Sequence, residues 1–398
     1  MPSVLGDMNA ALIIKHLESM DLFEGRYTNL KCCSFDLVSK KRRGRLSIVF
    51  KAIDKIQGCN VAIKVYDPSP QNMADLYRLN AFRREPEILT KLLNKTRCLQ
   101  LVAGYETFTL ETKMGEYVLS TPVFYFVTEW IEREIDDFFE KQNMIEASQK
   151  LTLFREILNA VEAFHSRGVV HRDLKPDNLR ARDLPGDRDV VAIDFGSGVA
   201  SDSDTSLDTY RSNVGAPYHS APEAMLGLAG HRTVAKLTDY YALGCMLYEL
   251  FHYGYFLSLT LRNREYQSAM LLIGARLSRE PDTQKKYLIW TQEAPRIAKA
   301  VRLGPFFGRD STAPRSLEGL LERIVDGLTR FDFQDRALLI PSVRDLVDTS
   351  LKVLDNSEAQ ARIARQARER RARRHDRVAE LDLRFERLGV AERGRRNA

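Results

Sequence analysis

Two neighbouring motifs constrain this chain more than any other feature: His171-Arg172-Asp173-Leu174-Lys175-Pro176-Asp177-Asn178, and the Asp194-Phe195-Gly196 that follows it. A carboxylate such as that of Asp173 can orient a hydroxyl nucleophile. Asn178 and Asp194 carry oxygen atoms, which are the ligands that a hard divalent cation prefers. The fold must therefore bring a loop and the end of a short hairpin to the same place.

Two further motifs flank this centre. Val61-Ala62-Ile63-Lys64 supplies a cation on a strand, and Ala221-Pro222-Glu223 closes the segment downstream. In these four motifs, their order and their spacing, the chain resembles the eukaryotic-type (Hanks-type) protein kinase family, in its Ser/Thr branch. A single tripeptide occurs often by chance, whereas an ordered set seldom does. The resemblance covers roughly residues 30–355.

The resemblance implies an α+β, bilobal kinase-like fold, with a small antiparallel β lobe that holds one helix and a larger, mainly helical lobe. Hydrophobic periodicity agrees with this architecture. We expect strands at 30–39, 46–53, 61–66, 99–110 and 118–131. We expect helices at 8–20, 73–93 (bent or interrupted at Pro86), 135–142, 148–166, 238–253, 315–330 and 341–355. The expected domains are an N-terminal helical extension (1–29), a small lobe (30–131), a large lobe (132–356) and an Arg-rich helical tail (357–398).

Composition indicates the size of the hydrophobic core and the kind of compartment in which the protein works. A chain of 398 residues that is 44% hydrophobic can bury one sizeable two-lobed core. No apolar run approaches the roughly 20 residues that span a bilayer, and residues 1–20 lack the basic start of a signal peptide. The five cysteines form no CxxC pair and suit free thiols in a reducing compartment. We therefore expect a cytoplasmic protein without membrane contact.

By resemblance, the catalytic residues are Asp173, Lys175, Lys64 and Glu85. Asp173 orients the substrate hydroxyl, and Lys175 reaches the transferred phosphoryl group, which favours a Ser/Thr acceptor. Lys64 contacts the α and β phosphates of ATP and pairs with a helix carboxylate. Glu85 and Glu87 are both candidates for that carboxylate, and the family pattern around Ile88-Leu89 favours Glu85.

The resemblance also places an ATP site between the lobes and a Mg²⁺ site beside it. The expected nucleotide-binding residues are Gly44, Val49, Ala62, Lys64, Glu129, Ile131 and Leu179, and the expected metal ligands are Asn178 and Asp194. Ala62 and Val49 would cover one face of adenine, and the backbone of Glu129 and Ile131 would bond its edge. Thr128 is small at the gatekeeper position, which predicts an open rear pocket.

Three departures from the family pattern favour slow or selective activity. Only Gly44 remains of three glycines in the phosphate loop, where Arg42 and Ser47 replace the others and should hold the loop away from the phosphates or stiffen it. Arg180 stands where an aliphatic residue usually lies beneath adenine, so that its stem would pack there with the guanidinium stacked or in solvent. Ala216 replaces a threonine whose hydroxyl would bond the catalytic Asp and Lys.

Other family positions are structural. By resemblance, Glu223 pairs with Arg336, and Asp239 anchors the catalytic loop. A packed column should contain Leu89, His171 and Phe195. The loop 197–213 is dense in hydroxyls and predicts autophosphorylation, with Ser212 as the main site and Ser201, Ser203, Thr205, Ser206 and Thr209 as secondary sites.

Two functions from different classes fit these residues. The first is a Ser/Thr protein kinase that transfers the γ-phosphoryl group of ATP to protein substrates. The alternative is a pseudokinase-like scaffold that binds nucleotide or a partner with little turnover. The complete set of Lys64, Asp173, Asn178 and Asp194 favours the kinase, because scaffolds commonly lose at least one of these. A kinase for a small metabolite is the weakest reading, given Lys175-Pro176.

The tail 357–398 carries a charge equal to that of the whole chain: its 13 Arg against 7 acidic residues give +6, and the formal net charge is +6. Residues 358–388 lack Pro and Gly and should be helical. Val378, Leu381, Phe385 and Leu388 form a short apolar stripe. One interpretation docks this stripe on the large lobe, and the other makes the tail a contact for an anionic partner or nucleic acid.

Overall fold

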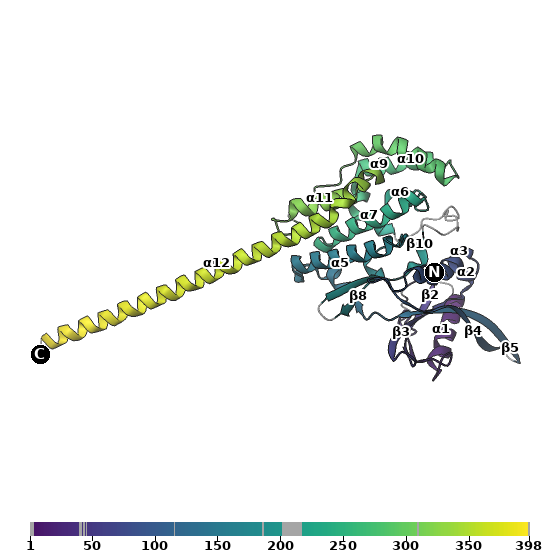
Figure 1. Ribbon diagram of the computed structural model, residues 1–398, viewed down its shortest axis with the longest axis horizontal. Coiled ribbons are helices and arrows are strands. Elements are labelled where there is room, and N and C mark those ends of the chain that lie inside the picture. The colour runs from purple at the N-terminus through teal and green to yellow at the C-terminus, as the bar shows by residue number, and fades with distance from the viewer. Residues whose placement is uncertain are drawn as a thin grey trace.

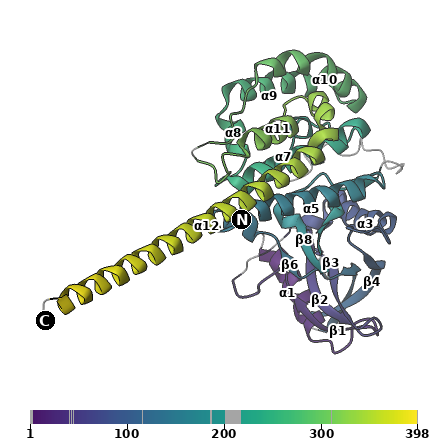
Figure 2. The same cartoon turned by 60° about the vertical axis from the view of Figure 1, so that its left-hand side comes forward.

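The computed structural model of the chain describes residues 4–396 apart from 40, 41, 43, 45, 115, 185, 186, 201–216 and 309, and from residue 370 onward it describes the backbone alone. The first part of the chain, purple to blue in Figure 1, forms a lobe built on a sheet, and the later part forms a helical lobe beside it (Figures 1 and 2). The expected α+β, bilobal fold is confirmed.

The small lobe is an antiparallel sheet of five strands. They are β1 (Tyr27–Cys32), β2 (Ser47–Asp54), β3 (Cys59–Tyr66), β4 (Leu101–Met114) and β5 (Tyr117–Glu129), in the order β1-β2-β3-β5-β4. β-Branched and aromatic residues that alternate along β2 and β3 give the sheet one buried face, where Phe50 and Ile63 lie opposite each other and are fully buried. The expected sheet is confirmed.

The first strand differs from its expected range of 30–39, because β1 ends at Cys32. Beyond that residue, the N–H of Cys33 still donates to the carbonyl of Val49 at 2.8 Å, but the next bond to β2 is made by a side chain. The hydroxyl of Ser34 accepts the N–H of Val49 at 2.8 Å, in place of a backbone carbonyl. The strand ends here because a side-chain hydroxyl, and no longer a backbone carbonyl, accepts the hydrogen bond from β2.

Helix α1 (Val4–Glu18) packs against this sheet, as its apolar spacing predicts. Ala10, Ile13, Ile14 and Leu17 are all at most 1% exposed and join the core of the sheet. The residues expected as a separate N-terminal extension thus share one hydrophobic core with the small lobe.

Helix α3 (Leu76–Lys91) follows the short α2 (Pro70–Met73) and begins at Asp75, whose side chain caps the N–H of Tyr77. We expected Pro86 to bend or interrupt this helix. It does not interrupt the helix, which continues to Lys91. A proline removes a single N–H from the helical ladder. Pro86 is itself buried against the core, and this packing keeps the helix continuous.

After the linker, the first part of the large lobe consists of short elements and two long helices. These are β6 (Arg133–Glu134), α4 (Asp137–Glu140), η1 (Gln142–Met144), α5 (Ala147–His165), β7 (Val169–Val170), η2 (Pro176–Asn178), β8 (Leu179–Leu184), β9 (Asp187–Ala192), η3 (Phe195–Ser197), β10 (Val199–Ala200), η5 (Pro217–His219), α6 (Pro222–Met225) and α7 (Arg232–Phe251). β8 and β9 form the expected hairpin. α7 is buried along most of its length, as its nearly continuous apolar sequence predicts.

Three helices between α7 and residue 315 were not expected: α8 (Leu257–Arg262), α9 (Arg264–Leu277) and α10 (Thr283–Ile297), followed by η6 (Ala298–Ala300). Their start signals are present in the sequence. Asn263 caps the N–H of Tyr266, and Asp282 caps that of Lys285. α9 and α10 pack around the buried Trp290 in a separate core cluster.

α11 (Glu318–Leu328) and α12 (Phe333–Arg396) complete the lobe. α12 has 64 residues, so the expected last helix of the large lobe and the expected helical tail are one continuous helix. Its first turns pack on α5, α7 and α11, and its yellow C-terminal part extends away from the body in both ribbon views (Figures 1 and 2). The docking interpretation of the tail is therefore wrong, because the backbone leads away from the large lobe.

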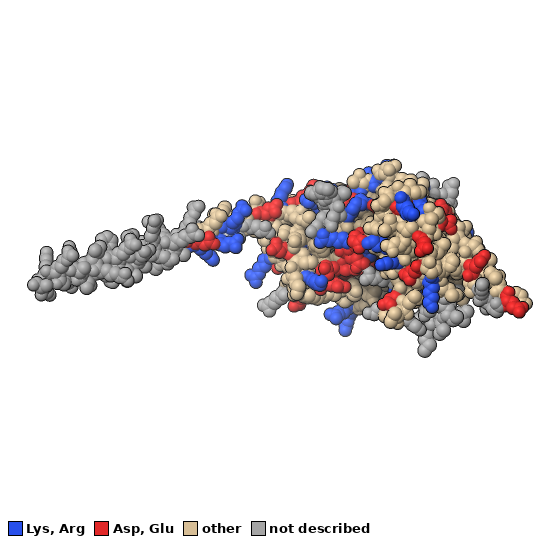
Figure 3. All heavy atoms as spheres, turned by 90° about the horizontal axis from the view of Figure 1, so that it is seen from below, with Lys and Arg blue, Asp and Glu red and all other residues tan. Residues whose placement is uncertain are grey.

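Charged side chains are interspersed over the body. On the face in Figure 3, basic and acidic groups alternate without a large field of one sign. This agrees with the equal number of basic and acidic residues, 47 each, in residues 1–356. Within the described part of the chain, no helix combines the length and apolarity needed to cross a membrane.

Candidate active site

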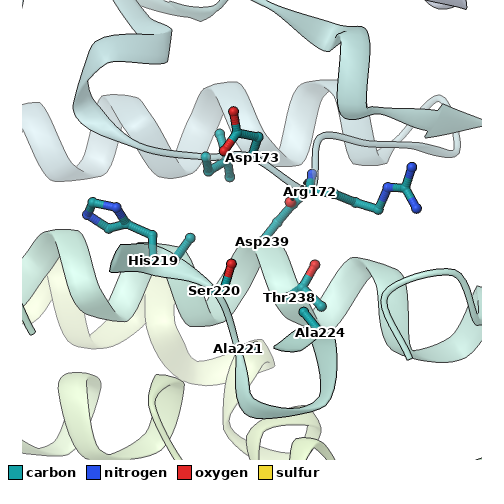
Figure 4. Close-up of a pocket in the computed structure, with 10 residues that line it drawn as sticks. Arg172, Asp173, His219, Ser220, Ala221, Ala224, Thr238 and Asp239 are labelled. Carbon is teal, nitrogen blue, oxygen red and sulfur yellow. Dashed lines mark hydrogen bonds between the residues drawn. The ribbon is translucent and has the colours of Figure 1, made fainter. Parts of the chain in front are cut away.

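The catalytic loop lies between β7 and β8 and is held by a carboxylate from α7. Asp239, fully buried, accepts the N–H groups of His171 at 2.9 Å and Arg172 at 2.8 Å. Its carboxylate also lies 2.8 Å from Nε2 of His165. Figure 4 shows Asp239 reaching from its helix to the loop at Arg172. Two of these three bonds come from the loop and the third from α5, so the buried carboxylate ties the loop to two helices, as expected for Asp239.

Arg172 directs its guanidinium away from the acceptor site. Its φ of 63° is left-handed, which is uncommon for a residue with a side chain. Nε donates to the carbonyl of Ser197 at 2.7 Å. Burial lowers the pKa of Arg172 to about 10, so that it remains a cation at neutral pH.

Asp173, Lys175 and Asn178 meet at the end of the loop. Nζ of Lys175 lies 3.2 Å from Oδ2 of Asp173. The amide nitrogen of Asn178 donates to the backbone carbonyl of Asp173 at 2.8 Å and to its Oδ2 at 3.1 Å. These contacts orient the carboxylate and leave Oδ1 of Asn178 as the atom that can bind a cation.

Lys64 on β3 connects the two lobes. Its Nζ lies 2.6 Å from Oε2 of Glu85 on α3 and 2.8 Å from Oδ1 of Asp194. Burial opposes the charge on Lys64, but the two carboxylates outweigh it and raise the pKa of the amine. Lys64 in turn lowers the pKa of Asp194. Of the two candidate carboxylates, the helix therefore directs Glu85 inward, while Glu87 is exposed.

The residues expected to hold Mg²⁺ are adjacent. The carbonyl of Asn178 accepts the N–H of Ile193 at 2.9 Å, which places Asn178 beside the residue before Asp194. The Asp194 side chain is 47% exposed, so its carboxylate is open to the cleft. A carboxylate and an amide oxygen form a donor set that suits Mg²⁺. These residues fit that ion.

A column of packed side chains supports this centre. The rings of His171 and Phe195 lie 4.7 Å apart, and Phe164 packs edge-on to Phe195 at 5.5 Å. Leu89 of α3 is fully buried in the same cluster. The N–H of Phe195 donates to Oε1 of Glu85 at 3.2 Å, which ties the column to the Lys64 pair.

Of the residues expected to contact adenine, Val49 and Ala62 lie on strands of the sheet, and Glu129 and Ile131 lie where the last strand meets the linker. Val49 and Ala62 are partly exposed on adjacent strands, with Val49 opposite Lys64 and Ala62 opposite Thr128. Ile131 is 8% exposed at the end of the linker, and the N–H of Glu129 donates to the carbonyl of Gln100. The carbonyl of Glu129 therefore remains the group of this residue that can bond a base.

Leu179 requires a correction. Its side chain has no exposed surface and lies in the large-lobe core, so it supports the floor of the cleft from below and does not contact a base. Arg180 also differs from expectation. Its guanidinium pairs with Glu134 at 3.3 Å and donates to the carbonyls of Asp177 and Leu179. The cation is thus neither stacked nor released to solvent.

The phosphate loop is tethered by one of its unusual residues. Arg42 binds the buried carboxylate of Asp67 at 2.6 Å and donates to the carbonyl of Gly44 at 3.1 Å. Gly44 has a φ of 81°, a conformation that favours glycine. Ser47 is buried at the start of β2. Arg42 therefore anchors the loop to the segment after β3. Of the two effects expected of Arg42, displacement of the loop or stiffening of it, this contact agrees with stiffening.

Beyond the catalytic loop lies a small pocket. Figure 4 shows Asp173 opposite the segment that carries His219 and Ser220, and these residues line the pocket with Arg172, Leu174, Ala221, Ala224, Thr238, Asp239 and Ala242. Nε2 of His219 lies 2.9 Å from Oε2 of Glu249 on α7. A signal for Glu249 is present in the sequence, because a carboxylate that follows an apolar run in a buried helix needs a partner. The remaining expected positions, Ala216 and the hydroxyls from Ser201 to Ser212, lie outside the described residues.

Comparison with known proteins decides the family. Residues 39–336 match the protein kinase domain family. The chain belongs to this family. Its buried pair of Glu223 and Arg336, which braces α6 against α12, agrees with that membership.

Of three relatives, two are named as serine/threonine-protein kinases and one as a calcium-dependent protein kinase. Calcium-dependent protein kinase 29 of Arabidopsis thaliana is 30% identical over 221 residues, which are 54% of this chain and 36% of the relative. A probable serine/threonine-protein kinase of Corynebacterium efficiens is 30% identical over 218 residues, 54% of this chain and 30% of the relative. Serine/threonine-protein kinase SIK1 of Rattus norvegicus is 28% identical over 228 residues, 57% of this chain and 26% of the relative. The chain thus spans about a third or less of the length of these relatives.

Proposed function

We propose that this protein is a Ser/Thr protein kinase that uses ATP and Mg²⁺. The observation that carries the proposal is the single centre formed by Lys64, Glu85 and Asp194 beside Asp173 and Lys175. Phosphoryl transfer requires positioning and neutralisation of charge more than covalent chemistry by the protein. This centre has cations, oxygen ligands and an orienting carboxylate for that purpose.

Bound ATP with Mg²⁺ would supply the phosphoryl group and a cation that neutralises its charge. Asn178 and Asp194 would hold the ion, and Lys64 would contact the phosphates. Glu85 keeps Lys64 directed into the cleft. Val49 and Ala62 would cover the base, and the carbonyl of Glu129 would accept a hydrogen bond from it.

Asp173 would accept a hydrogen bond from the substrate hydroxyl and direct its oxygen toward the phosphorus. Asn178 and Lys175 restrain its carboxylate, so little reorganisation is needed when substrate binds. Lys175 would stabilise the negative charge on the transferred group. A serine or threonine hydroxyl is the acceptor that the Lys175 position favours, and the names of two relatives support it.

The scaffold alternative would be favoured if one of the four residues Lys64, Asp173, Asn178 and Asp194 were replaced by a residue that cannot fill its role. All four are present. Arg42 lent weight to that alternative as a residue that displaces the phosphate loop. Its pairing with Asp67 and Gly44 restrains the loop and therefore weighs against such a displacement. A cytoplasmic location is part of the proposal and is supported by the five cysteines, which are free thiols.

The Arg-rich part of α12 is proposed as a contact for an anionic partner. The backbone of this part of α12 extends away from the body (Figure 1). Arg362, Arg365 and Arg368 are exposed on it. Binding through such charges should weaken steeply as the salt concentration rises.

The test of the kinase proposal is incubation of purified protein with γ-labelled ATP, Mg²⁺ and casein. Label should enter protein with the wild type. It should be lost in Asp173→Ala and in Lys64→Met. Asp173→Ala should keep the wild-type melting temperature, whereas Lys64→Met leaves the buried carboxylate of Glu85 without its cation and should remain folded but melt at a lower temperature. Equal labelling by wild type and Asp173→Ala would show that another group orients the acceptor.

A further inference from the structure

Tyr218 and Tyr255 form an exposed aromatic pair, here called the tyrosine ledge. Their ring centroids are 4.5 Å apart with an interplanar angle of 37°. Tyr218 is 49% exposed and Tyr255 is 54% exposed. Tyr218 belongs to η5, and Tyr255 lies in the turn between α7 and α8. Two large rings that touch each other and still keep half of their surface in water offer a flat apolar face to a partner.

One buried carboxylate holds both sides of the ledge. Oε2 of Glu249 binds Nε2 of His219 at 2.9 Å, and Oε1 accepts the N–H of Phe256 at 3.0 Å. His219 follows Tyr218 in the chain, and Phe256 follows Tyr255. Phe256 is 1% exposed and His219 is 6% exposed, so both attachments are inside the protein. The ledge is therefore fixed before a partner arrives, which lowers the entropy lost on binding.

The ledge adjoins the acceptor site. His219, next to Tyr218, lines the same pocket as Asp173 (Figure 4). A peptide whose hydroxyl lies at Asp173 therefore needs only a short extension across His219 to reach the two rings. This continuity with the acceptor site points to the protein substrate as the occupant of the ledge.

The chemistry of the occupant follows from the groups around the rings. Both oxygens of Glu249 already accept hydrogen bonds from within the protein, so this carboxylate is not available to pair with a basic residue. We propose that the tyrosine ledge binds an aromatic or large aliphatic side chain of the protein substrate, a few residues from the phosphorylated hydroxyl. The proposal rests on the kinase function and specifies the substrate class of that site.

The test uses the full chain, γ-labelled ATP with Mg²⁺, and a peptide library with a fixed Ser/Thr and one varied position at a time. The wild type should select aromatic or large aliphatic residues at one or two positions. Tyr255→Ala should lower that selection about tenfold, which is the effect of losing most of one apolar contact. For the best peptide, KM should rise by this factor with kcat within twofold. With alanine at the selected position, wild type and variant should have equal kcat/KM.

Two control variants separate binding from folding. Tyr255→Phe keeps the ring and should keep the selection. Tyr117→Ala removes a tyrosine that is 82% exposed at the start of β5 and should leave selection unchanged. Labelling without apolar selection, or an equal loss by Tyr255→Ala on all peptides, overturns the ledge proposal alone. A change only in oligomeric state would also overturn it and would assign the ledge to a second copy of the chain. Failure of the wild type to label any peptide overturns the kinase proposal, and this one with it.

Discussion

Lys150 on α5 is a buried lysine that forms no salt bridge with any residue that the structure describes. The residue is 1% exposed, and its Nζ contacts Oγ1 of Thr312 at 2.7 Å and the ring of Phe251 at 4.8 Å. Burial lowers its pKa from the ordinary value of 10.5 to about 8. At about 1.4 kcal/mol per pH unit, this shift corresponds to at most ~3 kcal/mol of destabilisation when the amine is protonated. Lys150→Met removes the charge and keeps most of the stem, but leaves the Thr312 hydroxyl without this partner at a cost of ~1 kcal/mol.

Lys150→Met should therefore raise the free energy of unfolding by about 2 kcal/mol at pH 7. Below pH 8 the amine is protonated in both states, so the full difference is present. Between pH 8 and 10.5 the unfolded chain binds a proton that the folded protein does not bind. The wild type is therefore stabilised as the pH rises through this range, and the advantage of the variant disappears near pH 10.5.

Urea unfolding of both proteins at pH 7, 8.5 and 10 measures this effect. Lys285→Met, a change at an exposed lysine, is the matched control and should change stability by no more than about 0.5 kcal/mol at any pH. Destabilisation by Lys150→Met at pH 7, or a difference that does not vary with pH, would refute the reasoning.

Four further predictions follow from the same contacts. Asp194→Ala should abolish phosphoryl transfer without lowering the melting temperature, and near-normal turnover would place the metal elsewhere. Arg42→Ala leaves the buried carboxylate of Asp67 without this cation, so unfolding measurements should show a loss of about 1–3 kcal/mol and kinetics should show a raised KM for ATP. Truncation after Asn356 should keep activity and melting temperature but remove salt-sensitive retention on a heparin column, and unchanged retention would contradict the proposed role of the tail. Mass spectrometry of active protein should find phosphate within 197–213, and its absence there would refute autophosphorylation of this loop.

Much of the fold could be predicted because its signals are local and repeated. Alternating β-branched residues predicted four of the five strands nearly at their bounds, and the apolar spacing of Ile13, Ile14 and Leu17 predicted α1. The bounds of β1 could not be predicted, since they depend on the hydroxyl of Ser34 replacing a ladder bond. α9 and α10 were missed although Asn263 and Asp282 cap them, because the apolar faces of these helices meet a separate core around Trp290.

The same division holds at the site. The motif residues could be predicted to converge, and the structure brings Lys64, Glu85 and Asp194 together. The direction in which a side chain points in the folded protein could not be predicted from the sequence. Leu179 and Arg180 are neighbours on β8, yet the first side chain enters the core and the second pairs with Glu134.

Phosphoamino acid analysis of the labelled product tests the central claim most directly. After incubation of the wild-type protein with γ-labelled ATP, Mg²⁺ and casein, acid hydrolysis should yield labelled phosphoserine and phosphothreonine. Labelling should disappear when Mg²⁺ is replaced by excess chelator and when Asp173 is changed to alanine. Label on tyrosine alone would contradict the assignment of the acceptor, and a wild-type product with no more label than that of Asp173→Ala would contradict the claim that this centre transfers phosphate.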